Sequence, residues 1–207
     1  MRKTRKICFR TESGFSLVEL LIVVFVVLVI GAMVIPNVLL AVTNLKLRAS
    51  AGDLSGLIQQ ARILAAKNNA PFVVLYGTRN GAQIAYIRDA RNGFGGYVTP
   101  EPLVEFSGTT VPAAGAPSGS GGQPSPYVLA GDTGTGSYDN TNTLGYTGRG
   151  LPCNYDTTAT PPCSTPPAKY FVYYLSDTGS GQTRWAGVVV TKSGRCKIVT
   201  WNGAAWN

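Results

Sequence analysis

The sequence predicts an α+β fold in which one long N-terminal helix packs on an antiparallel, sandwich-like β head. Two observations lead to this prediction. An apolar run at residues 15–35 continues into an amphipathic segment with helical spacing, and from Pro71 onward the chain changes to short apolar segments separated by turns. The length of 207 residues suits one domain with appendages.

Residues 1–14 form a basic leader. Five basic residues outweigh Glu12 there, so the leader carries half of the formal net charge of +8. They are Arg2, Lys3, Arg5, Lys6 and Arg10. Basic residues that flank an apolar span remain on the cytoplasmic side of a membrane. This charge therefore predicts membrane orientation rather than nucleic-acid binding.

The apolar run at residues 15–35 contains a single charged side chain, Glu19. As a helix the run would be about 31 Å long, which matches the bilayer core. Three interpretations fit such a run: a signal peptide cleaved after it, an uncleaved anchor, or a helix retained after cleavage before it, at Gly14. A helical continuation beyond the run argues against the first.

That continuation is the amphipathic segment at residues 36–70. Its apolar side chains recur at spacings of three and four, at Leu54, Leu57, Ile58, Ala61, Leu64 and Ala65. Pro36 predicts a kink rather than an end. Asn68 and Asn69, followed by Pro71, predict the end of the helix. We therefore expect one helix over residues 15–68.

The head is expected over residues 71–207. Strands are predicted at 71–76 and 82–88 as a hairpin, and at 96–106, where the prolines suit an edge strand. A second antiparallel group is predicted at 168–175, 184–191 and 196–201. Between the groups, residues 107–167 are rich in Gly, Ser, Pro and Asn. This composition predicts a flexible surface insertion, the alternative being a specific recognition loop.

Two of the four cysteines, Cys153 and Cys163, enclose a proline-rich stretch. If the head lies outside the cytoplasm, a disulfide between them is the natural interpretation. Cys8 lies in the leader. Cys196 lies in an apolar, strand-like segment and is expected to be a small core residue rather than a reactive thiol.

The segment "SGFSLVELLIVVFVVLVIGAMVIP" combines a basic leader ending in Gly14, then Phe15, Glu19 and Pro36. In this combination it resembles the type IV pilin and type II secretion pseudopilin superfamily. The resemblance implies that a prepilin peptidase cuts between Gly14 and Phe15 and that the new amine of Phe15 is N-methylated. It also implies a helix held in the bacterial inner membrane, with the N-terminus cytoplasmic and the head periplasmic, before entry into a helical filament.

The resemblance further implies that Glu19 meets the Phe15 amine of its own chain or of a neighbouring subunit. Such a pair offsets the cost of a carboxylate among apolar side chains and sets the register between helices. The alternative for Glu19 is a side chain near the membrane interface that reaches water.

The segment "LSGLIQQARILAAKNNAPFVVLY" resembles the GspH/FimT branch of the superfamily. Leu54, Leu57, Ala61, Arg62 and Ala65 occupy the matching positions. The resemblance covers about residues 10–90. It implies a minor subunit of a type II secretion pseudopilus or a type IV pilus, whose partners are other pilins or pseudopilins, the prepilin peptidase and the inner-membrane assembly platform.

An alternative within this branch is a FimT-like pilin that binds DNA during DNA uptake. The stretch "SGRCK" supplies Arg195 and Lys197, with Lys192 beside it, as candidate DNA contacts. Trp185, Trp201 and Trp206 are within reach in sequence and could stack on bases. A solvated basic turn over a core that contains the tryptophans is the simpler interpretation, and we favour it.

The chain contains no histidine, which excludes His-based metal sites and Ser-His-Asp catalysis. No nucleotide-binding glycine motif occurs. Asp132, Asp139 and Asp156 fit no EF-hand spacing. The sequence therefore predicts a structural protein rather than an enzyme, with no cofactor and no metal site.

Overall fold

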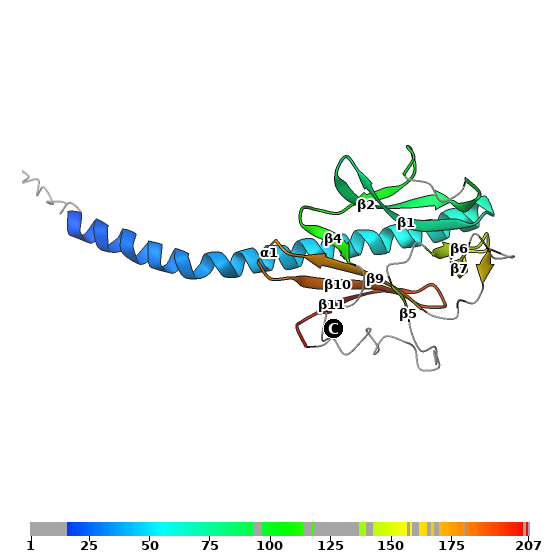
Figure 1. The fold of residues 1–207 in the computed structure, drawn as a ribbon. Coiled ribbons are helices and arrows are strands. Elements are labelled where there is room, and N and C mark those ends of the chain that lie inside the picture. The colour runs from blue at the N-terminus through cyan, green and yellow to red at the C-terminus, as the bar shows by residue number, and fades with distance from the viewer. Residues whose placement is uncertain are drawn as a thin grey trace, which may run out of the picture. The chain divides into compact units, whose positions relative to one another are not determined.

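The computed structural model describes residues 16–92, 97–113, 117, 137–139, 143–156, 158, 162–164, 167, 170–179, 181–204 and 206. The chain divides into two compact units, Met1–Leu40 and Ala41–Asn207. The predicted α+β class is confirmed, because one long helix is followed by two sheets (Figure 1).

Helix α1 spans Leu17–Asn68, 52 residues. Its first backbone bond runs from the Leu20 amide to the Ser16 carbonyl, at 3.1 Å. At its other end Asn69 adopts φ 46°, and the Ala70 amide donates to the Ala65 carbonyl at 3.2 Å. This is a Schellman cap, in which a left-handed residue ends the helix. The helix ends at the predicted residue, and it continues through position 36, where the kink at Pro36 stays a prediction.

The second half of α1 forms the centre of the Ala41–Asn207 unit. A buried stripe recurs every three or four residues, at Leu47, Ala51, Leu54, Ile58, Ala61 and Ala65. These side chains share one core with both sheets, including Val74 and Ile87 from one and Tyr173 and Val188 from the other. In Figure 1 this part of α1 runs between β1–β2 and β9–β10.

The first sheet has six strands in the order β3-β2-β1-β6-β7-β8. Their bounds are β1 Phe72–Arg79, β2 Ala82–Asp89, β3 Leu103–Glu105, β6 Leu144–Tyr146, β7 Pro152–Tyr155 and β8 Cys163–Ser164. A short 3-10 helix, η1, follows β2 at Ala90–Asn92. The predicted hairpin is present, and its turn residues Asn80 and Gly81 have φ 51° and 82°, as a type I′ turn requires. Of the strand predicted at residues 96–106, Leu103–Glu105 forms β3, which lies at the edge as predicted.

The second sheet has the order β11-β10-β9-β4, and β5 pairs in parallel with β9. Its bounds are β4 Thr110–Ala113, β5 Ser137–Asp139, β9 Tyr170–Asp177, β10 Arg184–Val190 and β11 Cys196–Trp201. Strands β9, β10 and β11 form the predicted antiparallel group.

Buried Asp177 ties β4 to the end of β9. Its carboxylate accepts hydrogen bonds from the hydroxyls of Thr109 and Thr110, at 2.8 and 2.7 Å, and from the Gly179 amide at 2.8 Å. Three donors on one carboxylate fix the ends of both strands.

The predicted flexible insertion at residues 107–167 is wrong for the parts that the structure describes. Strands β4, β6 and β7 arise from it, and the side chains of Leu144 and Tyr146 are fully buried in the core. The reason is a remote pairing, because β6 adds to β1 with Phe72 opposite Tyr146. Local composition carries no signal for such a partner. Most of residues 114–142 lie outside the described residues.

Candidate functional site

The first half of α1 has an exposed apolar surface. Large hydrophobic side chains are exposed on every face, for example Leu17 at 80%, Leu28 at 66% and Met33 at 71%. The helix is long and apolar enough to cross a membrane, by length and composition. A surface of this kind marks contact with lipid or with other apolar helices. This segment is therefore a candidate membrane span.

Glu19 lies in the first turn of α1 and is exposed among Val18, Leu20 and other apolar side chains. A carboxylate in the first turn interacts favourably with the helix dipole. The predicted cleavage and methylation residues, Gly14 and Phe15, lie outside the described residues, and so does the partner predicted for Glu19.

The second candidate site is formed by Arg62 and two arginine-bearing turns that it contacts in the Ala41–Asn207 unit. Arg62 extends from α1, and its Nε donates to the Gly150 carbonyl at 3.0 Å. A Cβ atom placed on Gly194 would lie 3.5 Å from Nη1 of the same arginine. Arg62 therefore contacts two turns that are far apart in sequence, residues 147–151 and 191–195.

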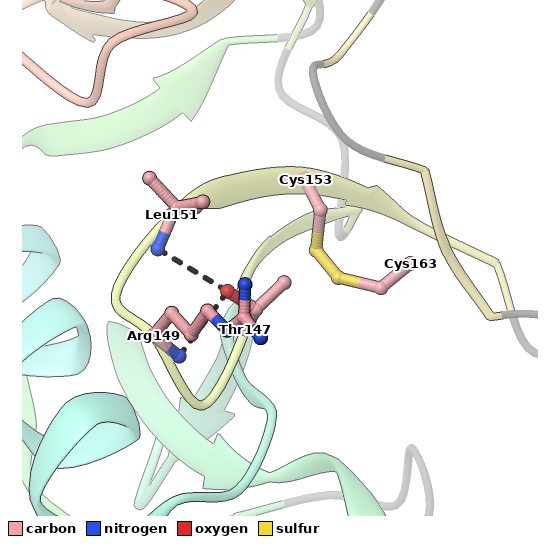
Figure 2. Close-up of a disulfide and its surroundings, with 5 residues drawn as sticks. All are labelled: Thr147, Arg149, Leu151, Cys153 and Cys163. Carbon is pink, nitrogen blue, oxygen red and sulfur yellow. Dashed lines mark hydrogen bonds between the residues drawn. A yellow bond between two sulfur atoms is a disulfide. The ribbon is translucent and has the colours of Figure 1, made fainter.

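Each of these turns is closed by a threonine and carries an exposed arginine. In the first, the Thr147 amide donates to the Leu151 carbonyl at 2.9 Å, and the Thr147 hydroxyl accepts from the Leu151 amide at 3.3 Å (Figure 2). In the second, the Arg195 amide donates to the Thr191 hydroxyl at 3.1 Å. Arg149 and Arg195 are exposed residues of these two turns. We call Arg62, Arg149 and Arg195 the arginine cluster.

The structure separates the DNA contacts predicted from sequence. Lys192 and Arg195 share one turn, but Lys197 lies in β11 in alternation with Val199 and Trp201, on the sheet face away from α1. Arg62 and Arg149 were not predicted as contacts. Arg62 lies in α1 outside the buried apolar stripe. This exposed position is the signal in the sequence that could have identified it as a candidate contact.

The tryptophans do not lie with these basic residues. Trp185 pairs with Trp201 at one end of the β10–β11 ladder, whereas Val190 pairs with Cys196 at the other, next to Arg195. The two ends are about 17 Å apart at the rise of an antiparallel strand. The tryptophans and the basic turn therefore lie at opposite ends of the ladder, and a shared role in binding DNA stays a prediction.

Cys153 and Cys163, the predicted pair, form a disulfide with Cα atoms 5.3 Å apart. It ties β7 to β8 (Figure 2). Cys153 is fully buried in a second apolar cluster behind the first sheet, with Val73, Leu75 and Tyr86. The disulfide therefore anchors a loop onto a packed surface.

Cys196 has a free thiol that packs against the main core. Burial raises the pKa of this thiol to about 11, although a hydrogen bond with Ser55 and the charge of Arg62 oppose the change. A thiol with such a pKa is protonated at neutral pH and is a poor nucleophile. The position agrees with the small core residue expected from sequence.

Across the part of the chain that the structure describes, no group of three or more His, Cys, Asp or Glu residues could hold a metal ion. Asp156, which is described, accepts hydrogen bonds from the amide and the hydroxyl of Thr158, at 2.8 and 2.7 Å. Asp132 and the side chain of Asp139 lie outside the described residues.

Comparison with protein-family models, curated proteins and solved structures gives no significant match. The functional argument therefore depends on the N-terminal motif, the helix and the side chains of the head.

Proposed function

We propose that this chain is a minor pilin or pseudopilin, a structural subunit of a cell-envelope filament that acts in type II protein secretion or type IV pilus assembly. The observation that carries the proposal is the division of α1. Its first half exposes an apolar surface with a single carboxylate, Glu19, and its second half supplies the buried stripe of a β head.

This division suits a subunit that moves from a membrane into a filament. Lipid tails and neighbouring apolar helices are similarly apolar surroundings for the first half of α1. The transfer from membrane to filament therefore gives little hydrophobic free energy. Helix packing and pairing of polar groups must then favour the filament. The head, which is fully packed around residues 47–65, remains in the periplasm and contacts other subunits there.

The proposed pairing of Glu19 requires cleavage. Before the cut, the nitrogen of Phe15 is a neutral amide within the chain, and afterwards it is a charged amine. Phe15 precedes Glu19 by four residues, about one helical turn, so the amine can reach the carboxylate of its own chain or of a neighbour. Removal of the leader by the prepilin peptidase therefore precedes assembly on the inner-membrane platform.

Intact-mass measurement tests the processing. The full chain, produced together with a prepilin peptidase, is expected to begin at N-methylated Phe15. The control variant Gly14→Val should keep its leader. A wild-type chain that reaches its filament with the leader attached would falsify the proposal.

Replacement of the carboxylate tests the assembly step. Glu19→Gln should still be processed and inserted in the membrane, because a neutral glutamine side chain is less costly inside the membrane than a charged carboxylate. Its cross-linking to neighbouring subunits should fall strongly. The matched control Glu105→Gln changes an exposed carboxylate of the head and should cross-link normally. Equal cross-linking of both variants would contradict the role of Glu19.

DNA binding by the head is the second candidate function, as in a FimT-like pilin for DNA uptake. The observation that favours it is the arginine cluster, because Arg62 contacts two remote turns and each of them carries an exposed arginine. Guanidinium groups bind phosphates with two parallel hydrogen bonds. Lys192 adds a further amine to the same turn.

Salt dependence of DNA affinity tests this candidate with the full chain in detergent micelles. The logarithm of affinity should fall with the logarithm of salt concentration by about 0.9 for each phosphate contact. Arg149→Gln and Arg195→Gln should each weaken binding and reduce that slope by about one contact. Arg79→Gln, which removes an arginine stacked on Tyr97, is the control. Absence of binding at low salt removes DNA uptake as a function.

A further inference from the structure

A cleft lies at the end of the β10–β11 ladder that is remote from the arginine cluster. It has a volume of about 470 Å³, and its walls include Gln182, Thr183, Arg184, Trp185, Trp201 and Asn202. A smaller hollow of about 210 Å³ shares the last four of these residues and adds Asn44 and Arg48 from α1. We call the two together the tryptophan cleft. The volume of the larger hollow, about 470 Å³, lies within the range of small-ligand sites, roughly 300–1,000 Å³.

The two indoles of the cleft are held by packing behind them. Trp185 and Trp201 are directly opposite each other across the two strands, and both are half-buried. Trp201 packs on Trp206 with ring centroids 5.5 Å apart, and Trp206 packs on Tyr174 at 5.7 Å. Rings supported in this way offer flat apolar surfaces at little cost in conformational entropy.

The polar groups of the cleft are amides, hydroxyls and guanidinium groups. Nη2 of Arg184 donates to Oε1 of Gln182 at 3.2 Å. The Nε atom of Arg184 is enclosed and has no hydrogen-bond partner among the described residues. An enclosed donor without a partner is costly and indicates a place for an acceptor. Exposed Arg48 adds a second positive charge, and neither hollow is lined by a described Asp or Glu.

We propose that the tryptophan cleft binds a saccharide that carries a carboxylate. One face of a pyranose ring consists of C–H groups and can stack on an indole. The sugar hydroxyls, which both donate and accept, match the amides and hydroxyl of Gln182, Asn202 and Thr183. The carboxylate supplies the acceptor for Arg184 and the counter-charge for Arg48.

The composition of the cleft favours a sugar over single-stranded nucleic acid. A nucleic-acid groove follows a strand with a row of positive charges. Here neutral hydrogen-bonding side chains outnumber the two arginines, and the arginine cluster lies at the opposite end of the ladder. The inference concerns the head alone and does not depend on filament assembly.

Fluorescence titration tests the site. All three tryptophans of the chain belong to the head, and two line the cleft. The full chain is kept in a detergent without a sugar headgroup and titrated with tetragalacturonate, an acidic oligosaccharide. A saturable change is expected, with affinity at least about tenfold weaker for neutral cellotetraose.

Variants locate the binding. Trp185→Ala should weaken tetragalacturonate binding by about tenfold or more, and Arg48→Gln, a change on an exposed helix surface, by about threefold to tenfold. The matched controls are Tyr97→Ala and Arg79→Gln, an aromatic and an arginine outside the cleft, and they should bind as the wild type.

Three outcomes would overturn the proposal. One is no saturable signal up to about 10 mM tetragalacturonate, a limit that corresponds to negligible affinity. Another is equal binding by Arg48→Gln and the wild type together with equal binding of the neutral and acidic sugars. The third is displacement of the sugar by oligothymidylate at much lower concentration, which would assign the cleft to nucleic acid.

Discussion

Opening the disulfide should destabilise the head by an amount that follows from the loop it closes. Cys153 and Cys163 are separated by 10 residues. The entropy of closing a loop of that length in the unfolded chain corresponds to about 2.7 kcal/mol at 25 °C. For a unit of this size, such a loss lowers the melting temperature by about 5–10 °C. The variant of choice is Cys163→Ser, because Cys163 is half-buried whereas Cys153 is fully buried.

Tryptophan fluorescence of the full chain in detergent measures this change, since Trp185, Trp201 and Trp206 all belong to the head. Reduction of the wild type with dithiothreitol should lower the melting temperature to that of Cys163→Ser, because both open the same loop. A Cys196→Ser chain keeps the disulfide and should retain its response to the reductant. If reduction leaves the wild type unchanged, the cross-link does not stabilise the head and the reasoning fails.

Three further substitutions have expected outcomes in the same melting assay. Gly148→Ala should lower the free energy of unfolding by about 1–3 kcal/mol. The new Cβ would lie 2.6 Å from Oδ1 of Asn69 and 2.8 Å from its carbonyl carbon. Gly52→Ala, within α1 with open space around it, should raise the free energy of unfolding by about 0.5–1 kcal/mol. Melting temperatures that change in the same direction for both glycine variants would contradict the steric argument. Burial raises the pKa of Asp177, but hydrogen bonds from two threonines and Gly179 and a nearby lysine lower it more, so the net shift is downward. The stability that the Asp177 carboxylate contributes is fully present above its pKa in the unfolded state. It is lost as the pH falls through its pKa in the folded state. Asp177→Asn should cost about 1.5–3 kcal/mol at pH 7, and the difference from wild type should narrow below about pH 4, whereas a constant difference would refute the assignment.

The helix, the first hairpin and the C-terminal strands were predictable because their signals are local. The stripe from Leu54 to Ala65 has the period of a helix, and Asn80-Gly81 between two apolar runs is a strong hairpin signal. Each of these elements is specified by residues within a few positions of one another.

The strands of the insertion and the arginine cluster were not predictable for the opposite reason. Leu144 to Tyr146 is a three-residue segment in a polar stretch, and it is buried because β1 and β7 pair with it. Likewise, Arg62 was placed correctly on the helix, but the turns that reach it depend on the arrangement of both sheets. Proximity in sequence did not locate the tryptophans relative to Arg195, because β11 runs away from that residue toward Trp201.

The pairing of β6 with the beginning of β1 has a consequence for how the chain must be handled. Without β6, the apolar start of β1, at Phe72 and Val73, would present unpaired amides and carbonyls along an open edge. Such an edge is a template for another chain and leads to strand exchange or aggregation. A version of this protein shortened by removal of residues 107–167 should therefore form insoluble or exchanged oligomers, although composition alone marks that segment as dispensable. The polar insertion thus protects the apolar start of β1.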